Sequence, residues 1–272
     1  MNVKSKLSLL CAMTLSTGII TNNVNAGDFD IEKTESLEIS AANLNSLSIK
    51  AGAGSLTIKG NSELSHIKVS ADLKVDKDNY ELSLTSEDEV AYLVSDANPN
   101  NDSNWWGESP SIDLTVELPD HFKLKVKDGS GEIDIINISN DLTIRDGSGS
   151  IEVSGIKGNL DINDSSGSIT VNDIDGELTI DDGSGSITVT KVSGKVVIDD
   201  GSGSINVSNL ASTLDIEDGS GSMSITGIKG HVTIDDGSGG ISLVDLAQGV
   251  TVIEEGSGGL SMKDVKGKVN MK

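Results

Sequence analysis

An aspartate returns every 18 residues through the second half of the chain, and its type and spacing suggest two kinds of chemistry. The column consists of Asp128, Asp146, Asp164, Asp182, Asp200, Asp218 and Asp236. If successive copies stack as strands about 4.8 Å apart, adjacent carboxylates repel each other by about 0.9 kcal/mol even in bulk water. Calcium could offset this repulsion, because it prefers six to eight oxygen ligands.

The calcium hypothesis concerns the column members Asp146, Asp164, Asp182, Asp200, Asp218 and Asp236. The other interpretation is an Asx turn, in which each side chain accepts hydrogen bonds from the amides that follow and stays solvated. We favour the turn, because the aspartate precedes the glycines here, whereas it follows them in the calcium-binding nonapeptide Gly-Gly-x-Gly-x-Asp. No other cofactor is expected.

Two adjacent tryptophans, Trp105 and Trp106, lie in a polar loop rich in Asn, Ser and Asp that spans 95–110. Neighbouring indole rings on such a loop could stack on sugar rings or enter a partner's surface. The alternative is that one ring folds back over the end of the fold. These two residues are the candidate ligand-binding residues of the sequence.

Catalysis is not expected from this sequence. A serine also recurs in every copy, but a nucleophilic serine needs a base beside it, and the three histidines, His66, His121 and His231, are widely separated. A polysaccharide-lyase-like enzyme would need acids clustered with Arg or Lys in a cleft, and no arginine follows Arg145. We therefore predict that the protein is not an enzyme.

The aspartates belong to a repeat that predicts the fold. Eight copies of roughly Asp-Gly-Ser-Gly-Ser-Ile-x-Val-x-x-Ile-x-Gly-x-Leu-x-Ile-x span 128–272, and five columns are apolar in every copy. Pairs such as Ile151 with Val153, and Leu160 with Ile162, alternate with other residues, which is the period of a strand. Each copy thus contains two short strands joined by glycine-containing corners.

Such short copies cannot bury a core alone, so we predict an all-β fold in which they stack as coils of a single-stranded parallel β-helix, or β-solenoid. Residues 128–272 contain no proline and no aromatic residue, which suits a narrow coil. An antiparallel β-meander or barrel is the alternative. Residues 27–127, in which 47–58 is a degenerate copy, are predicted to form atypical coils that cap the solenoid.

The first 26 residues are predicted to be a secretory signal peptide. Lys4 and Lys6 precede an apolar run, and Val24-Asn25-Ala26 fits a cleavage site. The single cysteine, Cys11, lies in that run, so the mature chain should have no disulfide, no lipid and no transmembrane segment. We expect an exported protein that is periplasmic, on the cell surface or extracellular.

Composition excludes nucleic acid as a partner. The chain has 20 Lys and Arg against 43 Asp and Glu, and a formal net charge of −23, so a phosphate polyanion would be repelled. The last copy is the exception, because it carries Lys263, Lys266, Lys268 and Lys272. Lysines on an edge discourage stacking of identical ends, so we expect a monomer.

The segment Ser111-Ile-Asp-Leu-Thr-Val-Glu-Leu-Pro119, then Leu124-x-Val126 and Gly-Ser-Gly-Glu-Ile-Asp-Ile, resembles the bacterial putative-adhesin domains of unknown function. The resemblance is good over 111–272 and loose over 28–110. It implies a β-helical envelope or secreted protein with an adhesive role, and it brings no catalytic residues. The expected function is a non-catalytic, adhesin-like binding scaffold for envelope or surface glycans or proteins. The alternatives are a structural spacer without a ligand and a calcium-stabilised repeat protein.

Overall fold

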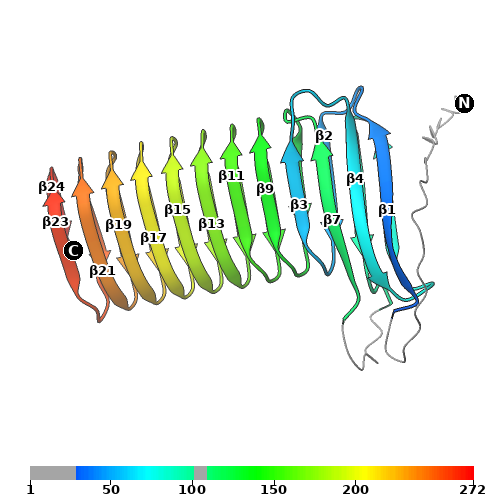
Figure 1. The fold of residues 1–272 in the computed structure, drawn as a ribbon. Coiled ribbons are helices and arrows are strands. Elements are labelled where there is room, and N and C mark those ends of the chain that lie inside the picture. Colours follow the sequence, from blue (N-terminus) through cyan, green and yellow to red (C-terminus); the bar gives the residue numbers. More distant parts are fainter. Residues whose placement is uncertain (1–28, 101–108) are drawn as a thin grey trace, which may run out of the picture.

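The computed structural model describes residues 29–100 and 109–272, in which every regular element is a strand. The predicted signal peptide and both tryptophans lie outside the described residues. Across the described ranges, no helix is long and apolar enough to span a membrane. The strands form a long rod, whose N-terminal end is broader than the rest (Figure 1).

The N-terminal part contains eight strands of unequal length. They are β1 (Ile31–Ser40), β2 (Ser46–Ala51), β3 (Leu56–Gly60), β4 (His66–Val75), β5 (Glu81–Glu87), β6 (Val90–Asp96), β7 (Ser111–Leu118) and β8 (Lys123–Lys127).

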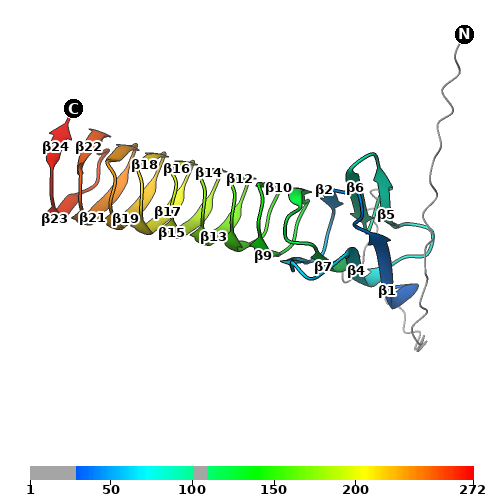
Figure 2. The same ribbon diagram turned by 90° about the horizontal axis from the view of Figure 1, so that it is seen from above.

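The repeats contribute one strand to each of two facing sheets per coil (Figure 2). In sheet A these strands are β9 (Ile133–Ile138), β11 (Ile151–Ile156), β13 (Gly167–Ile174), β15 (Gly185–Val192), β17 (Gly203–Leu210), β19 (Gly221–Ile228), β21 (Gly239–Leu246) and β23 (Leu260–Val265). In sheet B they are β10 (Leu142–Asp146), β12 (Leu160–Asp164), β14 (Leu178–Asp182), β16 (Val196–Asp200), β18 (Leu214–Asp218), β20 (Val232–Asp236), β22 (Gly249–Glu254) and β24 (Lys268–Met271).

Neighbouring repeat strands pair in parallel, with each residue beside its counterpart 18 positions later, or 19 positions later where the last coil pairs with its neighbour. Ile169 pairs with Ile187 in sheet A, and Ile180 pairs with Ile198 in sheet B. The predicted parallel β-solenoid with 18-residue coils is therefore confirmed, and the antiparallel alternative is wrong for the repeats. Antiparallel pairing joins only β1 to β4, β4 to β7 and β5 to β6 among the described strands.

The five apolar columns point inward and form one core between the sheets. Ile187, Val189, Val192, Val196 and Ile198 of a single coil are all at most 1% exposed. Their β-branched side chains suit a pleated surface, and stacking identical shapes in register fills the interior without rings. Burial is lost only in the last coil, where Met262, Val269 and Met271 are exposed.

The strands of the N-terminal part do not lie side by side in the order in which they follow one another in the chain. The degenerate copy supplies β2 and β3, and β3 lies between β7 and β9 while β2 lies between β6 and β8 (Figure 1). The segment 61–122 thus leaves the rod after β3, builds the broad end from β4 to β7, and returns on the other side of the β2–β3 coil. The division at residues 27 and 128 stays a prediction.

Candidate functional site

The aspartate column lies inside the solenoid. Asp200 follows Ile198 by two residues, so both side chains point to the same, inner side of β16, while Asp199 between them is exposed. All seven column members, Asp128 through Asp236, are buried, with exposed fractions of at most 6%. The expectation that these side chains stay solvated is therefore wrong, because strand alternation places them inward whatever their polarity.

One oxygen of most of these carboxyls caps the turn that follows, as the Asx-turn interpretation predicts. The Oδ1 atoms of Asp164, Asp182, Asp200 and Asp218 accept hydrogen bonds of 3.0–3.2 Å from the amide of the serine two residues later. Asp146 accepts one of 2.7 Å from the amide of Gly147. These bonds satisfy amides in the tight Gly-Ser-Gly corner that no strand ladder can reach.

The second oxygen of each carboxyl is buried without a hydrogen-bond partner. This holds for Oδ2 of all seven aspartates within the described part of the chain. Burial disfavours a charge, and it raises the pKa of Asp146, Asp182 and Asp200 to about 6, against the lowering effect of the turn amides. Burial and then the charge of Asp146 raise the pKa of Asp128 to about 7. Burial also raises the pKa values of Asp164, Asp218 and Asp236.

The described residues contain no group of three or more His, Cys, Asp or Glu side chains placed to hold a metal ion. Calcium binding by the column stays a prediction. The histidines remain apart: Nε2 of His231 lies 3.0 Å from Oγ1 of Thr251, and Nδ1 of His66 lies 3.0 Å from Oγ of Ser65.

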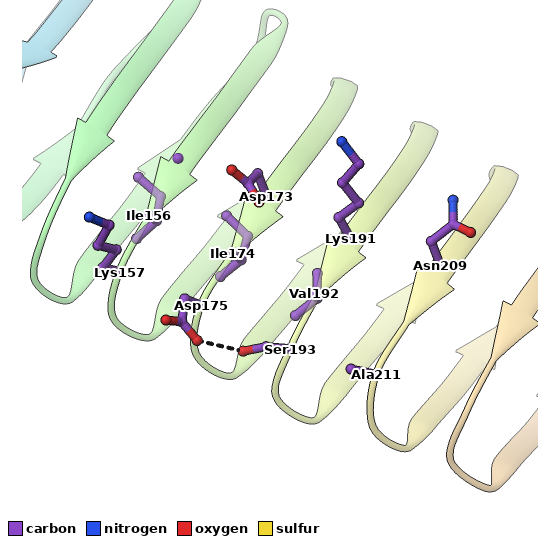
Figure 3. A pocket seen from close by; sticks show the side chains of 11 residues that line it. Ile156, Lys157, Asp173, Ile174, Asp175, Lys191, Val192, Ser193, Asn209 and Ala211 are labelled. Atoms are coloured by element: carbon purple, nitrogen blue, oxygen red, sulfur yellow. Dashed lines mark hydrogen bonds between the residues drawn. The ribbon is translucent and has the colours of Figure 1, made fainter.

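A groove that the sequence reasoning missed runs along the other corner of the coils. It has a volume of about 450 Å³ and crosses four coils, from Gly155 to Ala211. Ile156, Ile174 and Val192 contribute to its lining (Figure 3).

Charged side chains of both signs line the same groove. Lys157, Asp173, Asp175 and Lys191 are all exposed, and they come from three successive coils (Figure 3). Oγ of Ser193 donates a hydrogen bond of 2.9 Å to Oδ1 of Asp175, which links two coils across the groove. Ile156, Ile174 and Val192 are buried in the core beneath the groove, so a ligand would meet mainly the exposed charges of both signs, which suits a polar ligand.

The groove follows a column of residues with positive φ. Asn137, Asp173, Lys191, Asn209, Asp245 and Asp264 each have φ between 55° and 62°, and Gly155 and Gly227 fill the remaining two coils. This conformation adds one residue between two inward positions, such as Val189 and Val192, so the strand bends and its alternation restarts. The Asn, Asp and Gly composition of the column was the sequence signal that could have located this corner.

Lys191 is the exception among these residues. Every other non-glycine residue with positive φ in the described ranges is Asn or Asp, which tolerate the conformation. A lysine there is strained, and such strain is concentrated at functional sites. Lys191 therefore marks the groove as the best candidate contact site of the described surface.

Several solved structures resemble the fold at low identity. A putative cell adhesion protein from Clostridium sporogenes is 15% identical, with a TM-score of 0.39, covering 86% of this chain and 99% of that one. A putative adhesin from Parabacteroides merdae is 15% identical, with a TM-score of 0.34, covering 88% and 96%. A putative lipid binding protein from Parabacteroides distasonis is 16% identical, with a TM-score of 0.37, covering 88% and 96%. These scores are too low to transfer a function.

No curated protein matches the chain. A family model does: the one described as Toastrack DUF4097 matches residues 68–244. The match includes the broad N-terminal end from β4 onward and the repeats as far as β21, which is more than half of the chain. This chain therefore belongs to the DUF4097 toastrack family.

Proposed function

We propose that the protein is a non-catalytic, exported, adhesin-like scaffold that binds an envelope or surface glycan or protein through the groove at Lys157 and Lys191. The observation that carries the proposal is the strained lysine in an otherwise Asn, Asp and Gly column. A sequence selected for stability alone would place Asn or Gly at position 191.

The rod supports this function because it is a stiff platform. The core columns stay buried in every repeat but the last, and neighbouring strands stay paired along the rod, so a side chain on one of these coils keeps a fixed position relative to the next. Export is part of the proposal, on the basis of the signal-peptide pattern in 1–26. Whether the site of action is the periplasm, the cell surface or the medium follows from fractionating the producing cells.

The test measures binding of the mature protein to a glycan array and to isolated envelope fractions. The variant Lys157→Ala/Lys191→Ala should bind about tenfold more weakly than the wild type. The variant Lys68→Ala/Lys74→Ala is the matched control, because it removes two exposed lysines from β4, away from the groove.

A third variant, Trp105→Ala/Trp106→Ala, tests the tryptophan loop separately. Loss of binding in this variant alone would move the site from the groove to the loop. Equal binding by all variants and the wild type contradicts the groove. Absence of binding by the wild type favours the structural spacer.

A further inference from the structure

The aspartate column forms a continuous internal file of carboxyl groups along the rod. Ladder pairing places Asp146 beside Asp164, Asp182 beside Asp200, and Asp218 beside Asp236. Because coils are spaced by one strand separation, each inner carboxyl has another about 4.8 Å away on either side. The file therefore brings seven titratable carboxyl groups close together where water has little access.

Among residues 29–100 and 109–272, no Lys, Arg or His side chain forms an ion pair with this file. The ion pairs of the described residues use other carboxylates, those of Glu35, Asp141, Asp161 and Asp215. The charges that raise the pKa of Asp200 are also negative, and they come from Asp218 in the next coil and from Asp199 on its own strand. At the C-terminal end of the file, the negative charges of Asp235 and Glu254 contribute to the raised pKa of Asp236.

The facing strands of sheet A supply no counter-charge either. The only titratable residue of β15 and β17 is Lys191, which is exposed at the opposite corner. A row of buried carboxylates with no partner charge is strongly unfavourable, so the groups must acquire a cation or a proton.

We propose that the file binds protons, so that at neutral pH part of the seven aspartates are neutral carboxylic acids inside the rod. A neutral acid costs less free energy to bury than a carboxylate. Its hydroxyl can donate a hydrogen bond to the carboxylate of the next coil, which would give the unpartnered Oδ2 atom a partner. The folded rod is then more stable at mildly acidic pH than at alkaline pH.

The sign of the pH dependence follows from the folded and unfolded states. The column carboxyls have folded pKa values above the unfolded value, at about 6 for Asp200. Protonation therefore stabilises the fold fully below about pH 4, and this contribution is lost as the pH rises through about 6. Acidification from pH 7.5 to pH 5 should raise the Tm.

The variant Asp200→Asn tests the file, because an amide is a permanent mimic of the neutral acid. At pH 7.5 its Tm should exceed that of the wild type by about 2–4 °C, and its Tm should change less between pH 7.5 and pH 5. Asp199→Asn is the control, since it removes the same charge from the same coil at an exposed position. It should keep nearly all of the pH dependence of the wild type, because burial is the largest cause of the raised pKa of Asp200 and the charge of Asp199 is a smaller one.

Equal effects of the two substitutions on the pH dependence would overturn the proposal, because they would reveal only the relief of general negative charge. A lower Tm of Asp200→Asn at pH 7.5 would overturn it as well. Infrared spectroscopy gives a second, direct readout. The carbonyl band of protonated carboxyl groups should be present at pH 7, weaker in Asp200→Asn and unchanged in Asp199→Asn, and its absence from the wild type would contradict the proposal.

Calcium provides the competing outcome. With proton binding, millimolar calcium and magnesium should change the wild-type Tm by small and equal amounts, through screening. A large rise with calcium alone that Asp200→Asn abolishes would show that a metal ion, and not a proton, neutralises the file.

Discussion

The α-carbon of Gly203 lies so close to the carbonyl oxygen of Gly185 that a Cβ atom at position 203 would overlap that oxygen. Gly203 also has a φ of 149°, which residues with side chains rarely adopt. The same approach recurs between successive coils along the Gly-Ser-Gly corner. The spacing of the coils at this corner therefore depends on the absence of a side chain.

The substitution Gly203→Ala should lower the free energy of unfolding by about 1–3 kcal/mol, because the coil must move away from its neighbour. Chemical denaturation measures the loss. Gly259→Ala is the control, since a Cβ there meets no atom within 4 Å, and it should change stability by less than about 0.5 kcal/mol. Comparable stability of both variants would show that the corner can relax.

The substitution Ile187→Asp should destabilise the protein by about 4 kcal/mol, because it buries a carboxylate in the apolar column without a capping amide. Ile187 is fully buried, whereas Thr170 on the outer face of the preceding coil is exposed. Thr170→Asp is therefore the control and should be close to neutral. Hydrogen exchange should also show lost protection in the coils on either side, and an unchanged Tm would contradict the burial.

The substitution Lys191→Asn should stabilise the rod by about 1 kcal/mol, because asparagine tolerates the left-handed conformation better than lysine. At the same time it should weaken binding in the groove. Lys195→Asn is the control, because Lys195 lies outside the groove, where its Nζ atom is 2.7 Å from Oδ2 of Asp215. This variant should not increase the free energy of unfolding. A stability gain with unchanged binding would leave the strain without a functional reason.

The lysines of the last coil are predicted to keep the protein monomeric. In the two sheets β23 and β24 are terminal strands, and Lys263, Lys266, Lys268 and Lys272 are exposed next to exposed Met262. Replacing these four lysines with serine should promote association through the open edges, visible by light scattering.

The control for this prediction replaces four exposed lysines elsewhere, Lys68, Lys74, Lys125 and Lys127, with serine. It causes the same change in net charge and should remain monomeric. A wild type that is already a dimer and becomes monomeric when Lys263, Lys266, Lys268 and Lys272 are replaced would reverse the sign of the prediction.

The fold of the repeat region could be predicted from sequence because several independent features of the sequence indicate the same structure. The period of two, the β-branched residues and the 18-residue recurrence all indicate stacked strands, and Ile169 beside Ile187 is the direct result. The burial of Asp200 was available in the same period, since it lies two residues after Ile198. The residue type of an aspartate predicts exposure, but alternation decides on which side of the strand the side chain lies.

The N-terminal part and the groove were harder for different reasons. The pairing of β3 with both β7 and β9 joins segments far apart in sequence, and no local pattern encodes such a neighbour. The groove depends on where backbone turns leave space between coils, which periodicity does not measure. The positive φ of Asp173 and Asn209 was encoded only in residue types that also occur in ordinary loops.

The place of the β2–β3 coil has a consequence for the order in which the protein folds. Leu56 is fully buried between Leu114 and Ile133, so its strand has both of its neighbours only after residues near 133 have emerged. During synthesis or passage through a membrane in the N-to-C direction, the first coil must wait for almost half of the chain. Every later coil can add to a finished edge as soon as its own 18 residues arrive, so the slow step of folding is confined to the start of the rod.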